Sequence, residues 1–386
     1  MKKVIVFMGI FSIYILFAFT SCASLKPSDA KFVLEHSESV IATSFYQAEN
    51  TLATLTSDGT ITLWNTDNGE IIRRIDTNNK NHVTSLIYTG DNILAIYSNR
   101  DIIMYDPLNI EEPRMRFIPD GSVEQFVYFP KEKRVIFGIV NRTTDISGGS
   151  GSTVRLYTPT TVDYLEDNRS RETITSERRL RSVRFDNGPV IRDINLPTSR
   201  LITIENRTTS SFPSERTAED RMNEANYESQ KQNLERMYEL TSMAISSDGI
   251  IACGFFNGEI ILYDANTNRQ LREFQNSDNN AVTALTFTSH GRYLLSGSSD
   301  RIVRLWDREN NWSRVNQRKV VSVDSLRFSP NGESFIAARA GSFLVVDARN
   351  GNILHTISGS RTESVFYKNN NEIIIVGTRN RSVFIW

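Results

Sequence analysis

The chain has 386 residues, 39% of them hydrophobic and 23% charged, so it is long enough to bury a large core. Its 44 basic and 45 acidic residues nearly balance, which argues against a nucleic-acid-binding protein that relies on a strongly basic surface. Two cysteines exclude a disulfide-rich fold.

The first 21 residues have the pattern of an export signal. Lys2 and Lys3 precede an apolar run over residues 4–19, and small residues lead to Cys22. A cysteine at this point resembles a bacterial lipoprotein signal, although Phe19 stands where that motif usually has Leu. The resemblance implies that residues 1–21 are removed, that Cys22 carries the lipid anchor, for example palmitate, and that residues 22–30 form a tether. A plain signal peptide or an uncleaved anchor is the alternative.

Eight segments of the chain share one pattern. Each opens on a tight-turn pair, continues as an alternating strand, and in most cases ends at an aromatic residue six positions after the first turn residue. The turn pairs are Asp58-Gly59, Asn99-Arg100, Gly151-Ser152, Asn206-Arg207, Asn257-Gly258, Asp300-Arg301, Ala340-Gly341 and Asn380-Arg381. The closing residues are Trp64, Tyr105, Tyr157, Phe212, Tyr263, Trp306, Val346 and Trp386. This recurrence indicates that the chain is built from copies of one unit.

Further apolar strands surround each turn pair, giving four short strands in a unit of about 40 residues, which is typical of a β-propeller blade. Trp306-Asp307, Asn81-His82 and Ser299-Asp300 resemble the marks of the WD-repeat family, and the resemblance covers nearly all of residues 31–386. We therefore expect an all-β, WD-repeat-like β-propeller over these residues. Eight blades are preferred, and seven result if the fourth copy is only an insertion.

Three segments depart from the regular repeat. Residues 159–189 form an Arg-rich insertion, and residues 213–239 predict one inserted surface helix. Residues 31–36 read as a strand without a blade of its own, while the last copy lacks an outer strand. Pairing the first strand with the last copy would remove two open sheet edges, so we expect residues 31–36 to close the ring.

The motifs of common enzyme classes are absent from the sequence, so no cofactor or metal is expected and the protein is not predicted to be an enzyme. Cys253 lies in an apolar strand and is expected to be a buried, inert thiol. His82 occupies the place of the family's Gly-His histidine, which implies a structural hydrogen bond, whereas His36 and His355 fall on outer strands. The aromatic closing residues are expected to pack between blades.

Arginine holds the second position of four turn pairs: Arg100, Arg207, Arg301 and Arg381. In a propeller these turns emerge on one face, together with the loops between blades that carry Arg318, Lys319 and Arg361. We hypothesise that this face presents a basic rim to an acidic segment of a partner protein. The alternative is a set of solvated arginines without a shared role.

The resulting expectation is an exported scaffold, anchored to a membrane by its lipid, that binds partner proteins and not nucleic acid. Ala23 and Ser24 carry no acidic retention signal, which by analogy favours the outer membrane, facing the periplasm. One alternative is a propeller enzyme of the lactonase or lyase kind, for which Asp193, Asp324, Glu124 and Glu363 would be the nearest candidates. Another is a module that binds a glycan or peptide in the central channel.

Overall fold

The computed structural model describes a large part of the chain. The described residues are 23–25, 30–77, 83–89, 93–97, 102–105, 107, 115–117, 122–132, 134–147, 153–157, 171–184, 191–196, 202–205, 222, 229, 236–237, 239–320, 323–339, 342–359, 362–370, 372–379 and 381–385. Within them, no helix is long and apolar enough to cross a bilayer. The export signal predicted at residues 1–21, and Cys22, lie outside the described residues.

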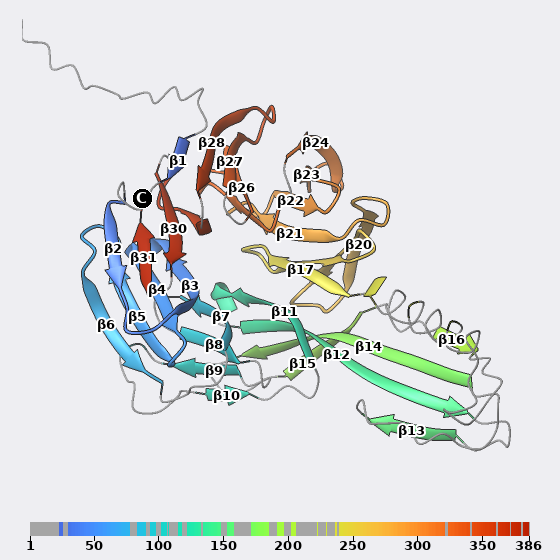
Figure 1. Ribbon diagram of the computed structural model, residues 1–386. Helices are drawn as coiled ribbons and strands as arrows, with labels where there is room; N and C mark the ends of the chain where they lie inside the picture. The colour runs from blue at the N-terminus through green and yellow to red at the C-terminus, as the bar shows by residue number, and fades with distance from the viewer. Residues whose placement is uncertain are drawn as a thin grey trace, which may run out of the picture.

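The described strands form seven sheets that are arranged in a ring (Figure 1). The inner strands are β3 (Val40–Tyr46), β7 (Val83–Tyr88), β11 (Ser122–Phe129), β17 (Leu240–Ile245), β21 (Val282–Phe287), β25 (Ser325–Phe328) and β29 (Thr362–Tyr367). The second strands are β4 (Thr51–Thr56), β8 (Ile93–Tyr97), β12 (Arg134–Ser147), β18 (Ile250–Phe255), β22 (Tyr293–Ser298), β26 (Ser334–Arg339) and β30 (Ile373–Arg379). Each inner strand pairs antiparallel with its second strand.

The outer half of each sheet completes the blade. The third strands are β5 (Thr60–Asn65), β9 (Ile102–Tyr105), β14 (Arg171–Arg184), β19 (Glu259–Asp264), β23 (Ile302–Asp307), β27 (Ser342–Asp347) and β31 (Ser382–Ile385). The outer strands are β6 (Ile71–Asp76), β10 (Met115–Phe117), β15 (Ile191–Asn195), β20 (Gln270–Gln275), β24 (Ser313–Lys319), β28 (Ile353–Gly359) and β2 (Phe32–Glu35). The remaining elements are β1 (Ala23–Leu25), β13 (Thr153–Tyr157), β16 (Ile202–Glu205) and the short 3₁₀ helices η2 (Gln47–Glu49) and η3 (Pro130–Glu132).

Burial follows the position of a strand in its sheet. All six residues of β4 are buried, whereas β20 is exposed at all but one position. Middle strands are covered on both faces by neighbouring sheets, so consecutive residues can be apolar, as in the run Ile250-Ile251-Ala252-Cys253 of β18. One core cluster shows the arrangement, since Leu295 and Val303 of one sheet pack with Leu326 and Phe335 of the next. The all-β propeller expected from the sequence is confirmed.

The closing residues take the buried positions expected of them where the structure describes their side chains. Trp64, Tyr263 and Trp306 are each no more than 5% exposed on their third strands. Tyr157 differs, because it lies on β13, which is not the third strand of a blade. Phe212 and Trp386 lie outside the described residues. Cys253 is fully buried on β18, as predicted.

The preference for eight blades is not confirmed, because the third and fourth copies contribute to one sheet. Strands β12 and β14 are 14 residues long and pair along their whole length, and β15 completes the sheet. Beyond the ring, β13 pairs with β12 and β16 pairs with β14, forming an arm that extends outward (Figure 1). The Arg-rich segment at residues 159–189 therefore supplies β14, the third strand of a blade, where it is described.

Two N-terminal strands join the ring out of chain order. Strand β2 pairs antiparallel with β31, with Leu34 opposite Val383, and so lies at the outer edge of the last sheet. Strand β1 pairs parallel with β28, with Ala23 opposite Ile357. Part of the segment expected to be a polar tether is thus a strand. The helical insertion at residues 213–239 lies mostly outside the described residues; Met222, Ser229, Arg236 and Met237 are helical.

Candidate protein-binding face and channel mouth

One face of the ring is built from two kinds of loop that contact each other. Turns between second and third strands lie against the linkers that run from each outer strand to the next inner strand. Ser299 N donates to Ala281 O at 2.9 Å, Val320 N donates to Arg301 O at 2.8 Å, and His36 N donates to Arg381 O at 2.8 Å. We call this side the loop face, and the opposite side, with turns such as Ser329–Gly332, the turn face.

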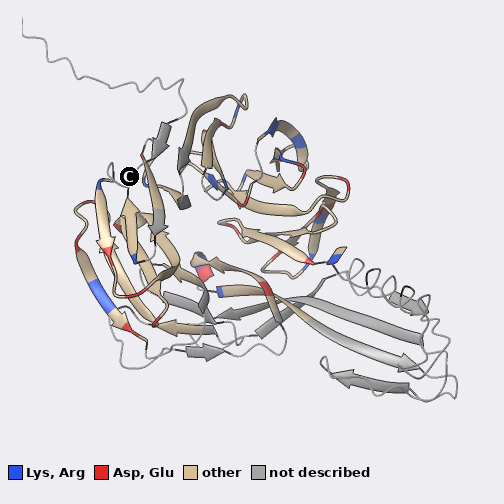
Figure 2. Cartoon of the chain, viewed as in Figure 1, with Lys and Arg blue, Asp and Glu red and all other residues tan. Residues whose placement is uncertain are grey.

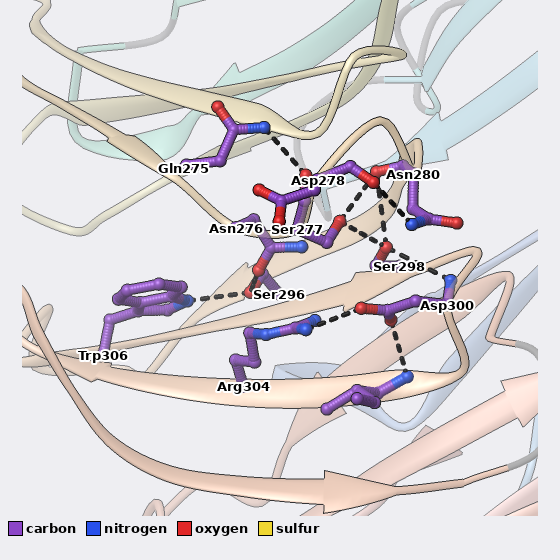
Figure 3. A network of polar contacts seen from close by, with 11 residues as sticks. Gln275, Asn276, Ser277, Asp278, Asn280, Ser296, Ser298, Asp300, Arg304 and Trp306 are labelled. Carbon is purple, nitrogen blue, oxygen red and sulfur yellow. Dashed lines mark hydrogen bonds and ion pairs between the residues drawn. The ribbon is translucent and has the colours of Figure 1, made fainter.

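Buried polar networks hold the loop face in place (Figure 3). In the sheet of β21–β24, Trp306 Nε1 donates to Ser296 Oγ at 2.8 Å, and Ser296 Oγ donates to Asn276 Oδ1 at 2.5 Å. The hydroxyls of Ser277 and Ser298 are hydrogen-bonded at 2.9 Å. Because these contacts join the third strand, the second strand and the linker, the linker is fixed relative to its blade.

The turn at Asp300 is fixed in the same way. Its Oδ1 accepts from Ile302 N at 2.9 Å, and its Oδ2 accepts from the guanidinium of Arg304 at 2.6 Å. Arg304 is only 6% exposed, so this ion pair is well shielded from solvent. Asp300 therefore orders the turn on which Arg301 is presented.

His36 forms the equivalent network where the ring closes. Its Nε2 lies 2.8 Å from Thr54 Oγ1, which also accepts from Trp64 Nε1 at 2.9 Å. Burial is the main cause that lowers the pKa of His36. The family resemblance implied this structural role for His82, which lies outside the described residues, whereas His36 was predicted only to fall on an outer strand. One signal was available: a hydroxyl residue precedes both Trp64 and Trp306 by 10 positions.

The structure describes two of the four turn arginines that were predicted to form the basic rim. Arg301 is exposed and has a left-handed backbone, with φ of 67°. Arg381 is exposed, and its guanidinium lies 3.5 Å from Glu38. Arg100, Arg207 and Arg361 lie outside the described residues. Figure 2 shows acidic and basic residues interspersed around the described part of the ring.

The inner strands share a β-bulge next to the loop face. In six of the seven described inner strands, one residue is skipped in the pairing with the second strand; these residues are Ile41, Thr84, Glu124, Thr241, Thr283 and Glu363. Asp324 holds the same place in the seventh, because its N–H donates to Ala338 O while Ser325 is the paired partner of Ala338. A bulge redirects a side chain out of the regular alternation.

The bulge residues surround the loop-face mouth of the channel. Thr241 Oγ1 donates to Val282 O at 2.7 Å, and Thr283 Oγ1 donates to Val323 O at 2.5 Å. Glu124 Oε2 accepts from Leu240 N at 3.2 Å. These side chains thus bond to the start of the next inner strand, while Asp324 is exposed to solvent. Glutamate or aspartate occupies three of the seven positions, so the mouth is acidic by sequence.

The bulge positions were not predicted from the sequence, although the spacing of its apolar residues indicates them. Val282 and Leu285 are both buried and three residues apart, as are Val323 and Leu326. Residues on one side of a regular strand are an even number apart, so a spacing of three requires an extra residue between them.

Of the four residues considered for a propeller enzyme, Glu124, Asp324 and Glu363 share the bulge position at the channel mouth, whereas Asp193 does not. Asp193 lies on β15, which is an outer strand and does not line the channel mouth. Glu124 is bonded to the backbone of β17, and Glu363 lies at the bulge of β29. Among the described residues, no three His, Cys, Asp or Glu side chains could jointly hold a metal ion. Burial also raises the pKa of the Cys253 thiol, which keeps it protonated.

A family model for the WD domain, G-beta repeat, matches residues 268–307. The match contains the complete Asn276–Ser296–Trp306 network. The chain also resembles the β-propeller domain of Cps50 (Swd1) from Myceliophteria thermophila, with a TM-score of 0.60 at 16% identity, covering 92% of this chain and 98% of that domain. The chain therefore has the β-propeller fold, and residues 268–307 match the WD repeat.

The propeller is also similar in sequence to subunits of larger complexes. It is 25% identical over 154 residues to target of rapamycin complex subunit wat1 of Schizosaccharomyces pombe, covering 38% of this chain and 49% of wat1. It is 31% identical over 108 residues to target of rapamycin complex 1 subunit mip1 of the same yeast, covering 25% of this chain and 8% of mip1. The propeller thus spans about half of one relative and less than a tenth of the other.

Proposed function

We propose that this propeller is a non-enzymatic scaffold that binds partner proteins through its loop face. The observation that carries the proposal is the pairing of buried networks with exposed charges on that face: Asp300 fixes the turn, while Arg301 next to it is exposed. A rigid loop loses little conformational entropy when a partner binds. The names of wat1 and mip1, both subunits of complexes, support the same role by analogy.

An acidic segment of a partner protein fits the loop-face turns that carry Arg301 and Arg381. Arg301 has no carboxylate within ion-pair distance among the described residues, and the 3.5 Å contact of Arg381 with Glu38 is exposed. Exposed ion pairs contribute little, so both guanidinium groups remain available to a partner carboxylate. Such contacts would mainly speed association and select the partner.

We further propose that the protein is exported and held at the outer membrane, facing the periplasm, by a lipid on Cys22. Cys22 directly precedes β1, which pairs with β28 at the outer edge of a blade. Consecutive Cα atoms are about 3.8 Å apart, so a lipid on Cys22 would sit at the circumference of the ring. The disc would then stand with both the loop face and the turn face open to partners.

The experiment is recovery of partners from membranes of the source cells, using the tagged full chain. Reversing the turn arginines (R301E with R381E) is expected to reduce partner recovery at least about tenfold, because two attractive contacts become repulsive. The matched control is R349E, since Arg349 is an exposed arginine on the turn face. Unchanged recovery with R301E/R381E, or equal loss with R349E, would contradict the loop-face proposal.

The anchor is tested separately by Cys22→Ser. The variant is expected to leave the membrane fraction, while the purified propeller still captures its partner, because Cys22 precedes the ring. Retention of C22S in membranes would contradict lipid attachment at this residue without affecting the binding proposal.

A further inference from the structure

Arg327 is a cation inside the ring that the loop-face proposal does not use. It lies on inner strand β25 and is accessible to solvent. It lines a cavity of ≈ 390 Å³ between the inner strands, together with residues of β17, β21 and β11. Its guanidinium carbon lies 4.5 Å from the ring centroid of Phe366 on the neighbouring strand β29. One face of the guanidinium therefore stacks on Phe366, and its N–H edge is left for another group.

No carboxylate of the described residues balances this charge. Within the described part of the chain, Arg327 has no acidic group within ion-pair distance. Counted from the shared bulge, Thr286 on β21 and Ala244 on β17 hold the same position on their strands as Arg327 holds on β25. Neither of them is charged. Desolvation lowers the pKa of the Arg327 guanidinium. Arg327 is thus a solvent-accessible cation without a protein counter-charge, and a bound anion would supply one.

The surrounding polar groups can complete a ligand site. Thr286, Ser325 and Gln125 line the same cavity and are half-buried. Among the described residues, their side chains form no hydrogen bond with the protein, so their hydroxyl and amide groups can still donate. A volume of ≈ 390 Å³ suits a small molecule.

The channel is asymmetric in charge along its length. Asp324 and Glu124 lie at the loop-face mouth, whereas Arg327 lies three residues further along β25, about 10 Å toward the turn face. Acidic groups at one mouth repel an anion, so the favourable entrance is the turn face. This separates the site from the loop face, where a protein partner would dock.

We propose that the central channel binds a small ligand through its carboxylate or phosphate group, held by the guanidinium of Arg327 and oriented by Thr286, Ser325 and Gln125. The N–H edge of a stacked guanidinium can form two parallel hydrogen bonds to either group. The shared feature of the ligand is thus a planar or tetrahedral oxyanion on a body small enough for the channel.

The test is calorimetric titration of the full chain in detergent at low ionic strength, with inorganic phosphate and with succinate as probes. At least one probe should bind with one-to-one stoichiometry. Arg327→Gln should weaken that binding about 10- to 100-fold, the effect of losing a charge-assisted contact. Phosphate alone would indicate a phosphate ester as the ligand, and succinate alone a carboxylate.

Two variants make the outcome decisive. Arg301→Gln, which removes a loop-face arginine, should leave the affinity unchanged. Arg327→Lys keeps the charge without the planar fork, so it should weaken binding less than Arg327→Gln, and it serves if the glutamine variant does not fold. Failure of both probes to bind the wild-type chain, or equal binding by R327Q, would overturn the proposal.

Discussion

His36 Nε2 lies 2.8 Å from Thr54 Oγ1, and this contact joins the last sheet of the ring to the first. His36 follows β2, the outer strand of the last sheet, while Thr54 is on β4 of the first. The imidazole ring also packs on Trp64, with centroids 5.1 Å apart. Ring closure therefore depends on this polar contact in addition to the pairing of β2 with β31.

This contact predicts a pH dependence of stability. Burial lowers the pKa of His36 in the folded protein, so the unfolded chain binds the proton more tightly. The stability contributed by neutral His36 is present above about pH 6.5, the unfolded value, and is lost as the pH falls toward the lower folded value. The melting temperature should thus fall between pH 7 and pH 5.5, and less steeply in His36→Gln. His290→Gln, at an exposed turn, is the control and should keep the wild-type slope.

A second prediction concerns the buried donor of Trp306. Trp306→Phe keeps most of the ring but removes the N–H that donates to Ser296 Oγ. We expect a loss of about 1–2 kcal/mol in the free energy of unfolding, measured by urea titration. Trp312→Phe is the control, because Trp312 is also buried but its indole N–H has no such partner among the described residues. Equal losses for the two variants would assign the effect to packing alone.

Adjacent residues of β2 give a third prediction, on ring closure. Leu34 is 2% exposed and belongs to a core cluster with Val383 and Trp64, whereas Val33 is 47% exposed. Leu34→Ala should cost about 2–5 kcal/mol in the free energy of unfolding, because it leaves a cavity between blades. Val33→Ala should cost less than about 0.5 kcal/mol. If chemical denaturation gave similar values for both, β2 would not be an integral strand of the ring.

Local patterns predicted the blade but not how many blades there are. Asp58-Gly59 and Asn257-Gly258 both form tight turns with positive φ at glycine, as their chemistry requires. A turn pair indicates a hairpin, however, whether or not that hairpin belongs to a blade. Tyr157 therefore looked like a closing residue although β13 pairs with the far end of β12, outside the ring. The length of β12 and β14 is set by pairing between distant segments, which turn residues do not encode.

The candidate site was predictable to a similar degree. The buried third-strand aromatics follow from their spacing, and the exposure of Arg301 and Arg381 follows from their place in turns. The side chain that bonds to the hydroxyl behind each buried indole is less visible, since Asn276 and His36 fill this role with different chemistry. Arg327 was not singled out because one arginine on a strand has no pattern; only the ring places it beside Phe366.

A fourth prediction tests how tightly the linker covers its turn. Gly258 has φ of 86°, and a Cβ there would lie 2.0 Å from the carbonyl oxygen of Ser277. Gly351 has φ of 72°, but a Cβ there would lie no closer than 3.6 Å to any neighbour. Both Gly→Ala changes cost about 1–2 kcal/mol from the left-handed backbone. Only Gly258→Ala must also displace the linker backbone, so its loss in urea unfolding should exceed that of Gly351→Ala by at least about 1 kcal/mol. Equal losses would mean that the linker yields without cost and that the loop face is less rigid than its networks imply.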